Sequence, residues 1–449
     1  LQDLLLTELA QLPGLRVTSR QSTMRYRNSQ LAAADIAGEL GVDALVEGSL
    51  LQAGSDIDIT VQLIDGHSDK HLWAERYTGE TPRGISLIAA IADAIGAEIG
   101  VITVPRGLDE QAGVRMGTID PRAFNAYLMG TVQLDRYTPD GIRTAIDQLQ
   151  TAVAIEPGLA QAWSRLAGAY ALESMFGLAP PGDAMELARA AALRAVEADE
   201  RYFGGHSALG FGRLWTGDIE GACESFDVAI RLNPSATNAI HGQADCLMFV
   251  GRVEESLDLL HELLIISPFS VFHSMPLPIH LYMAGRPDEA IDVITAMRKR
   301  TPQYALHWVL ANIYWQQGRF DMALEEERLE LEQRGDTILL AVLEEGLGNA
   351  GPAGVMRAMA EALIARSAEN YVDPFHIAKY FARAGLADET LHWLDRAVEL
   401  GSYETAYIAF WPYLDFLRAD PRYPDVLERV YGPRAQRVGQ PGFLGPQPH

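Results

Sequence analysis

Residues 214–234 read Leu214-Trp-Thr-Gly-Asp-Ile-Glu-Gly-Ala-Cys-Glu-Ser-Phe-Asp-Val-Ala-Ile-Arg-Leu-Asn-Pro234 and contain three markers that recur along the chain. A glycine marks the turn between two helices, a small residue follows five positions later, and a proline closes the second helix. Each marker returns after 33 or 34 residues. The markers are Gly217, Gly251, Gly285 and Gly318; Ala222, Ser256, Ala290 and Ala323; and Pro234, Pro268 and Pro302. This period predicts stacked helical pairs.

The repeat extends in both directions from this stretch. Upstream, Pro157 fits the ladder if Met175–Asp183, a turn-rich segment, is an insertion within one pair. Downstream, Gly385 lies about two periods beyond Gly318, with a degenerate pair around Gly351. The chain from 121 to 430 is therefore expected to hold about eight helical pairs.

The first helices of these pairs carry a recognisable pattern. Trp163-Ser-Arg-Leu-Ala-Gly-Ala-Tyr170 has the order Trp-x-x-Leu-Ala-x-x-Tyr, which resembles the tetratricopeptide repeat (TPR). An unrelated helical bundle with accidental spacing is the alternative. The expected fold class is mainly α, a TPR-like α-solenoid preceded by a small α/β domain.

Residues 1–104 have a different periodicity. Helical spacing is seen in the ranges 1–12, 32–40 and 85–102, and a short strand is expected at Leu15–Ser19. Between 45 and 77, alternating apolar residues and two turns predict a three-stranded antiparallel meander. The range 105–120 is interpreted as a linker, and 431–449, rich in Pro and Gly, as a flexible tail.

The composition excludes several classes of protein. The 449 residues include 36 basic and 60 acidic side chains, a net charge of −24, and the sequence shows no basic cluster, which argues against direct nucleic-acid binding. No apolar run is long enough to span a membrane, so no membrane insertion is expected. Cys223 and Cys246 show neither CxxC nor Cys/His spacing. They are interpreted as unpaired core residues, which favours the cytoplasm.

Several segments together resemble a family of bacterial regulators in which a module like the TolB amino-terminal or FlgO-type domain precedes a TPR array. They are Leu12-Pro-Gly-Leu-Arg-Val-Thr-Ser-Arg20, Leu40-Gly-Val-Asp-Ala-Leu-Val-Glu-Gly-Ser49, Thr60-Val-Gln-Leu-Ile-Asp65, His71-Leu-Trp-Ala-Glu-Arg-Tyr77 and Leu417-Arg-Ala-Asp-Pro-Arg-Tyr423. The resemblance implies an upstream effector in the same chain: a ToxR/CadC-type winged helix, a class III nucleotide cyclase or a kinase. It also implies that the chain starts after the module's first strand, and that a periplasmic location is the alternative to the cytoplasm.

No catalytic, cofactor-binding or metal-ligating motif is identified. His67 and His71 flank a turn, and Asp56 and Asp58 belong to the solvent face of a strand. His273 and His280 are interpreted as packing residues. Glu325-Glu-Glu-Arg-Leu-Glu-Leu-Glu332 is interpreted as a solvated helix face, with an interaction surface as the alternative. The chain itself is predicted not to be an enzyme, although an upstream cyclase or kinase domain would make the whole protein one.

A concave groove lined by the first helices is the expected binding surface of such an array. The candidate residues are Phe211, Trp215, Asn238, His241, Asp245, Met248, Phe272, Met275, Tyr282, Trp308, Asn312 and Trp315. Core packing between repeats is the competing interpretation for each. No lysines accompany the asparagines as in a carboxylate clamp, and the acidic charge favours a basic or apolar partner.

The leading hypothesis is therefore a sensory and protein-interaction region of a multidomain bacterial signalling or transcriptional regulator, with a peptide or protein as partner. A standalone TPR adaptor in envelope assembly is the alternative, and the C-terminal part of a cyclase or kinase is a weaker one. Homodimer formation is left open.

Overall fold

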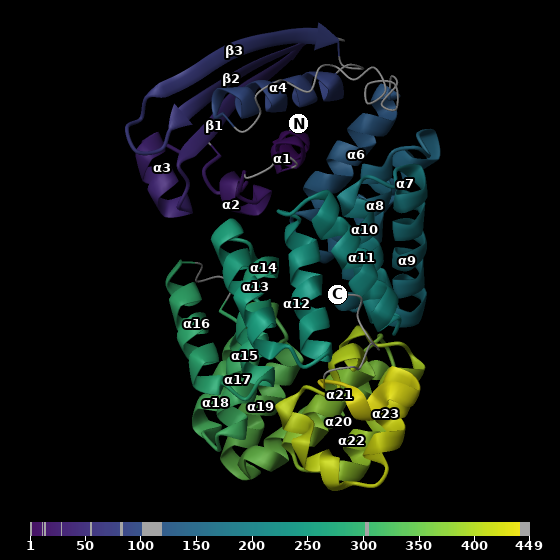
Figure 1. The fold of residues 1–449 in the computed structure, drawn as a ribbon. Coiled ribbons are helices and arrows are strands. Elements are labelled where there is room, and N and C mark those ends of the chain that lie inside the picture. The colour runs from purple at the N-terminus through teal and green to yellow at the C-terminus, as the bar shows by residue number, and fades with distance from the viewer. Residues whose placement is uncertain are drawn as a thin grey trace.

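The computed structural model describes residues 2–10, 12, 15–27, 29–53, 56–80, 84–100, 119–300 and 305–440. A small sheet with helices forms the N-terminal part and lies at one end of a long helical array (Figure 1). The N-terminal elements are α1 (Gln2–Ala10), α2 (Arg20–Met24), α3 (Ala33–Leu40), β1 (Ala44–Ala53), β2 (Asp56–Asp65), β3 (His71–Glu80) and α4 (Gly84–Glu98).

The three strands form an antiparallel meander in the order β1-β2-β3, as the alternating apolar residues predict. Ile59, Val61 and Leu63 of β2 are buried against α4 and α1, which cover one face of the sheet (Figure 1). Asp58 points to the other face, where it forms an ion pair with Arg76. The expected strand at Leu15–Ser19 is wrong: these residues are irregular and lead directly into α2.

The helical array consists, in the part of the chain that the structure describes, of eight successive helical pairs. They are α6 (Pro121–Leu134) with α7 (Pro139–Ile155), α8 (Ala160–Met175) with α9 (Pro181–Ala198), α10 (Phe203–Trp215) with α11 (Ile219–Leu232), α12 (Thr237–Phe249) with α13 (Val253–Ile266), α15 (Pro276–Met283) with α16 (Pro287–Arg300), α17 (His307–Gln316) with α18 (Phe320–Arg334), α19 (Thr337–Asn349) with α20 (Gly351–Ser367), and α21 (Pro374–Arg383) with α22 (Ala387–Glu399). A short helix, α14 (Val271–Ser274), precedes α15. The predicted fold class is confirmed.

The repeat markers have a direct physical role in these pairs. Gly217, with φ at 87°, and the glycines one, two and three repeats later all adopt the left-handed backbone that a side chain disfavours. The small residues five positions on are fully or almost fully buried. Close approach of the paired helices therefore depends on them. The turn-rich insertion is the loop between α8 and α9.

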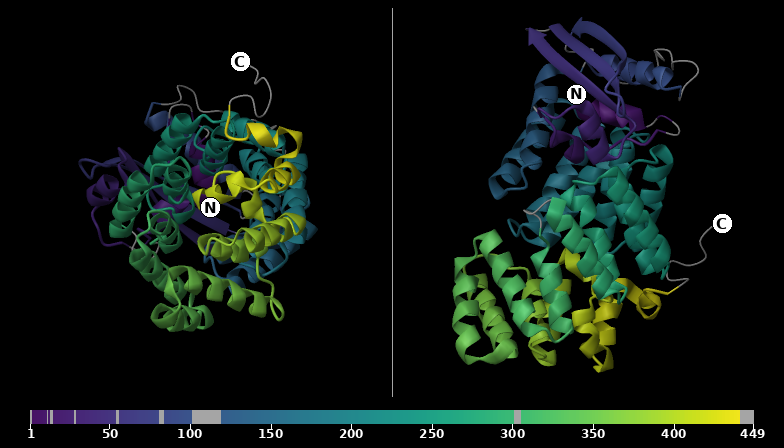
Figure 2. Two further views of the ribbon diagram at one scale, coloured as in Figure 1. Left: turned by 90° about the horizontal axis from the view of Figure 1, so that it is seen from below. Right: turned by 90° about the vertical axis from the view of Figure 1, so that its left-hand side faces the viewer.

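After α22 the chain turns back into the array. The segment η2 (Tyr403–Tyr407) packs on α10, and η3 (Pro412–Ala419) packs on α17 and α21, followed by α23 (Tyr423–Tyr431) and η4 (Gly432–Arg437). Viewed from below, the array curves into a ring, and these C-terminal elements lie on its inner side (Figure 2). The solenoid thus fills part of its own concave surface.

The expected flexible tail from 431 onward differs from the structure in its first ten residues. Tyr431 and Ala435 are buried, and the backbone amide of Gly439 donates a hydrogen bond to the carbonyl of Phe249 at 2.7 Å. Residues 441–449 lie outside the described residues, as does most of the expected linker. Asp120, at the linker's end, caps α6 by accepting from the amide of Arg122.

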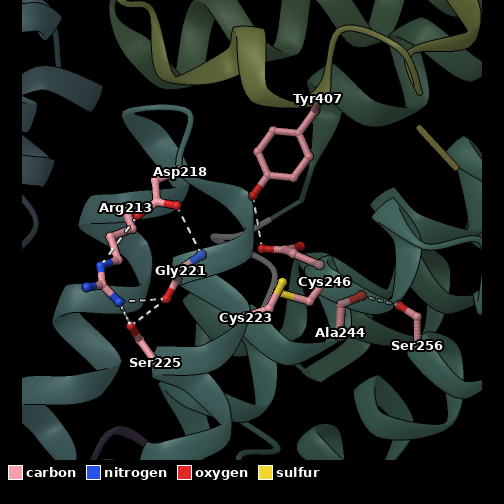
Figure 3. The surroundings of a disulfide bond; sticks show 10 residues. Arg213, Asp218, Gly221, Cys223, Ser225, Ala244, Cys246, Ser256 and Tyr407 are labelled. Carbon is pink, nitrogen blue, oxygen red and sulfur yellow. Dashed lines mark hydrogen bonds and ion pairs between the residues drawn. A yellow bond between two sulfur atoms is a disulfide. The ribbon is translucent and has the colours of Figure 1, made fainter. Parts of the chain in front are cut away.

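The interpretation of Cys223 and Cys246 as unpaired is wrong, because they form a disulfide between α11 and α12 (Figure 3). Their Cα atoms are 5.7 Å apart. The sequence concealed this pairing, since the two residues come from adjacent helices of neighbouring repeats and match no short cysteine motif. The argument for the cytoplasm that rested on unpaired cysteines is therefore withdrawn.

The acidic stretch of α18 is only partly a solvated face. Glu325 and Glu332 are exposed and pair with Arg328. Glu327, however, is buried and forms an ion pair with Arg383 of α21 at 2.6 Å. A charge run on a helix hides such an inward residue because helical periodicity turns one position in three or four toward the neighbouring helix.

Candidate ligand-binding cavity

The inner side of the array encloses a cavity of about 1190 Å³. Its wall is built from α2, from the ends of α6 and α18, from the inner helices α8, α10, α12, α14, α15, α17 and α21, and from the C-terminal segment 403–413. Most of its surface is aromatic or aliphatic, with a smaller number of charged groups. This combination of an apolar body and a few convergent polar groups is typical of a small-ligand or peptide site.

Seven of the twelve sequence-predicted residues line this cavity. They are Phe211, Trp215, His241, Asp245, Phe272, Met275 and Trp308. Phe211 stands at the centre of an aromatic group, with its ring 5.0 Å from that of Trp215 and 5.4 Å from that of His241, measured between centroids. The structure therefore brings these residues to one surface.

The other five candidates pack in the core or form hydrogen bonds that hold other side chains in place. Met248 and Tyr282 are buried in the hydrophobic core. Trp315 packs edge to face on Phe320, with ring centroids 4.9 Å apart.

The two asparagines hold other side chains. Asn238 is hydrogen bonded to Nε2 of His273 at 2.9 Å. Asn312 accepts two hydrogen bonds from Arg383 and donates one to the carbonyl of Trp308. Neither lies among the residues that line the cavity.

A buried polar network forms one side of the wall. The carboxylate of Asp245 contacts Nε2 of His280 at 2.9 Å through Oδ1 and accepts from the hydroxyl of Tyr407 at 2.9 Å through Oδ2. Nδ1 of His280 in turn lies 2.9 Å from Oγ of Ser256. Burial and the neighbouring carboxylate raise the pKa of Tyr407 well above its usual range, so this phenol stays protonated as the donor.

His241 completes this side of the cavity. Burial lowers its pKa despite the carboxylate of Asp245, which lies 3.9 Å from Nε2. Its Nδ1 is buried and has no hydrogen-bond partner among the described residues. The neutral imidazole therefore keeps one buried nitrogen without a hydrogen-bond partner in this part of the wall.

Replacing Tyr407 with Phe is expected to lower the free energy of unfolding by about 1.5 kcal/mol, the lower end for a hydrogen bond to a charged group. The loss arises because Asp245 stays buried while one of its donors disappears. Urea unfolding measures it. Tyr77→Phe is the control, since its bond to Glu75 is exposed and its removal should change stability by less than about 0.5 kcal/mol. Equal effects of the two variants would contradict the assigned role.

The C-terminal segment supplies residues that the sequence reasoning missed. Tyr403, Tyr407, Trp411 and Tyr413 line the cavity, and the rings of Trp308 and Trp411 meet edge to face at 6.0 Å. The dense aromatic content of 403–413 was the available signal. The position of this segment could not be predicted, because the repeat period describes only how neighbouring helical pairs follow one another. It says nothing about a segment that folds back onto the array.

Basic groups gather on another side of the wall. Arg334 and Lys379 line the cavity together with His376, whose Nε2 lies 2.9 Å from the carboxylate of Glu404. Burial lowers the pKa of Lys379, an effect that the carboxylates of Glu327 and Glu404 oppose. Over the whole cavity, five Lys or Arg and three Asp or Glu side chains are lining residues. The acidic chain thus surrounds a cavity in which basic lining residues outnumber acidic ones.

The N-terminal part contributes to the cavity wall. Met24, Arg25 and Arg27, in and just after α2, are lining residues. The guanidinium of Arg25 lies 4.5 Å above the ring of Phe269, and the amide of Phe269 donates to Oγ of Ser22 at 3.1 Å. A ligand in the cavity would therefore touch both the array and the N-terminal part.

No group of three His, Cys, Asp or Glu side chains in the described ranges has a geometry suited to a metal ion. None of the helices that the structure describes has both the length and the apolar character needed to cross a membrane.

The helical array is a TPR-like solenoid. No family model matches the sequence. A protein of Rhizobium meliloti (strain 1021) described as "Putative adenylate cyclase 3" is 30% identical over 165 residues, which make up 36% of this chain. The chain spans about a quarter, 27%, of the length of this curated relative.

The solved structures that resemble the chain do so weakly. The human IFIT1 dimer with m7Gppp-AAAA covers 89% of this chain and 94% of its own, with 12% identity and a TM-score of 0.46. Yeast Tom70 covers 75% and 83%, with 12% identity and a TM-score of 0.41. TTC0263, a thermophilic TPR protein of Thermus thermophilus, covers 40% and 92%, with 19% identity and a TM-score of 0.34.

Proposed function

We propose that this chain is the sensory and protein-interaction region of a multidomain bacterial signalling regulator. A peptide or protein partner binds at the inner face of the TPR-like array. The N-terminal part relays binding to an effector domain upstream in the same protein. The observation that carries the proposal is the shared cavity wall, in which α2 meets the inner helices of the array.

The effector is proposed to be a nucleotide cyclase or a transcriptional regulator. The similarity to a protein described as a putative adenylate cyclase supports the first class. The match covers only a part of that protein. A standalone adaptor is the competing proposal. Reading the gene upstream of Leu1 separates the two: an effector domain there supports the sensor, and a start codon or signal peptide immediately before Leu1 supports the adaptor.

The disulfide favours one compartment for the region. Disulfides persist mainly in oxidising compartments, so the Cys223–Cys246 pair supports a periplasmic position in place of the cytoplasmic one. In that arrangement the effector lies on the other side of a membrane. Trapping free thiols with an alkylating reagent in living cells tests this, because cytoplasmic protein would be alkylated at both cysteines.

Trp308→Ala tests the assignment of the inner face in the full-length protein. We expect partner binding to weaken by about 2 kcal/mol, as for an interface hot spot, and effector output to lose its response. Trp163→Ala is the control, because Trp163 is a similarly half-buried tryptophan that lies outside the cavity wall. A large loss of thermal stability in Trp308→Ala with unchanged binding would refute the assignment.

A further inference from the structure

We propose that the cavity binds a small organic anion, with its aromatic or aliphatic body against the tryptophan and methionine side chains and its acidic group at Lys379 and Arg334. This inference rests on the cavity assigned above as the binding site. It goes further by naming the chemical class of the ligand, and it does not require an upstream effector.

Lys379 is the first observation behind the acidic group. Its ammonium makes no hydrogen bond or ion pair with any residue that the structure describes, and it lies 5.4 Å from the ring centroid of Tyr380. The two nearby carboxylates are already engaged: Glu327 by Arg383, and Glu404 by His376. A charged group withdrawn from bulk water without a partner is costly, so a ligand that supplies an anion is favoured here.

Arg334 is the second observation. It lines the same cavity, and its positive charge acts on both Lys379 and Glu404, which places the two cations on one stretch of wall. Its side chain is 58% exposed, and it is one of the residues that line the cavity. Only Nε is committed, to Glu330 at 2.6 Å. The charge of Arg334 helps to lower the pKa of Lys379, so an anion bound beside both side chains would relieve the repulsion between them.

Two of the cavity's three acidic residues are already engaged. Asp245 is held by His280 and Tyr407, and Glu404 by His376. Arg136, in contrast, lines the cavity with no side-chain partner in the described ranges. Lysine and arginine side chains therefore outnumber carboxylates on the cavity wall, in a chain of net charge −24.

The lining of the cavity suits a ligand with an apolar body. Its volume of about 1190 Å³ is close to the upper end of the usual range for small-ligand pockets, roughly 300–1,000 Å³. Trp215, Trp308, Phe272 and Met275 provide the apolar surface.

A matched pair of fluorescent probes tests the inference on the chain itself. 8-Anilinonaphthalene-1-sulfonate carries a sulfonate on an aromatic body, and N-phenyl-1-naphthylamine is the same body without it. We expect the sulfonate probe to bind about tenfold more tightly or better, equivalent to about 1.4 kcal/mol, and that preference to fall as salt is added. Energy transfer from the cavity tryptophans reports that the probe lies inside.

Lys379→Met is the decisive variant, since it keeps the length of the side chain and removes the charge. The preference for the sulfonate should fall several-fold, because Arg334 alone remains at the site. Binding of the neutral probe, which also reports an intact cavity, should stay unchanged. Arg357→Met is the control, because that arginine pairs with Glu361 on the outer surface. Equal affinities of the two probes for the wild-type chain, or an unchanged preference in Lys379→Met, would overturn the inference.

The outcomes also separate this inference from the proposed function. If the charge preference is absent but Trp308→Ala still abolishes partner binding in the full-length protein, the ligand class is wrong and the binding face stands. If an acidic peptide competes with the sulfonate probe more strongly than small aromatic carboxylates do, the site takes a peptide and the small-molecule assignment fails.

Discussion

Arg383→Ala is expected to cost about 3–5 kcal/mol of unfolding free energy, the largest loss for any single change considered for this protein. Arg383 of α21 is 5% exposed and donates to Glu327 of α18 at 2.6 Å and to Oδ1 of Asn312 of α17. Removing it leaves the carboxylate of Glu327 buried with the hydroxyl of Tyr380 as its remaining hydrogen-bond donor. Urea unfolding followed by circular dichroism measures the loss.

The pH dependence of this variant identifies the cause. The Arg383 charge opposes the effect of burial and holds the pKa of Glu327 below its usual value, so the pair stabilises the fold at neutral pH and loses that effect as pH falls. In Arg383→Ala, burial acts without that opposing charge. The defect should therefore shrink as pH falls through the ordinary pKa of a glutamate, because Glu327 becomes protonated in the folded variant while the wild-type pair loses its stabilising effect as pH falls toward its own lowered pKa.

Arg357→Ala provides the matched control for the buried pair. It removes a helical ion pair with Glu361 in which both side chains are more than half exposed, so the expected loss is at most about 0.5 kcal/mol. Comparable losses in the two variants would show that burial does not govern the Arg383 network. A defect that is constant from pH 4 to 8 would contradict the role of the Glu327 charge, because a cavity alone does not titrate.

The helical repeat could be predicted from the sequence because each of its markers meets a local structural requirement. Gly217 and its equivalents are needed at single backbone positions with positive φ, and Ala222 and its equivalents fill single tight contacts. The residues that meet these two requirements therefore recur at a fixed interval in the sequence. The meander was readable for the same reason, since alternation in β2 directly reflects one buried and one exposed face.

Contacts between residues that are distant in the sequence could not be predicted from it. Cys223 and Cys246 meet because α11 and α12 pack side by side, and Arg383 reaches Glu327 across 56 residues of sequence. Within the described ranges, no strand pairs with Leu15–Ser19. These residues instead bring α2 to residues 266–269, where Ser19 donates its amide to the carbonyl of Ile266.

The residues of the candidate groove could be predicted in part, because equivalent positions recur on the inner helix of each pair. Seven of the predicted residues line the cavity, yet the same counting also selected Tyr282 and Asn312, which face the core and the Arg383 network. The curvature of the array determines which inner positions stay open, and the C-terminal segment then covers some of them. Lys379 was passed over because one lysine on an amphipathic helix has no signature of its own.

Reducing the Cys223–Cys246 disulfide is expected to lower the unfolding free energy by about 3 kcal/mol, the value for a closed loop of roughly this length. The bond joins residues separated by 23 positions and constrains the unfolded chain. It also fixes α12 beside α11 next to Asp245, so reduction should loosen the polar side of the cavity wall. Urea unfolding with and without dithiothreitol measures the change.

The double variant Cys223→Ala/Cys246→Ala separates the bond from the effect of the reductant. Its stability should match that of the reduced wild type to within about 1 kcal/mol, the size expected for trimming a small buried side chain, and it should not respond to dithiothreitol. The sulfonate probe should bind the reduced protein less tightly, because Asp245 orients His280 and Tyr407 from the helix that the disulfide holds. Two freely titrating thiols in protein purified without reductant would contradict the pairing, and with it the argument for an oxidising compartment.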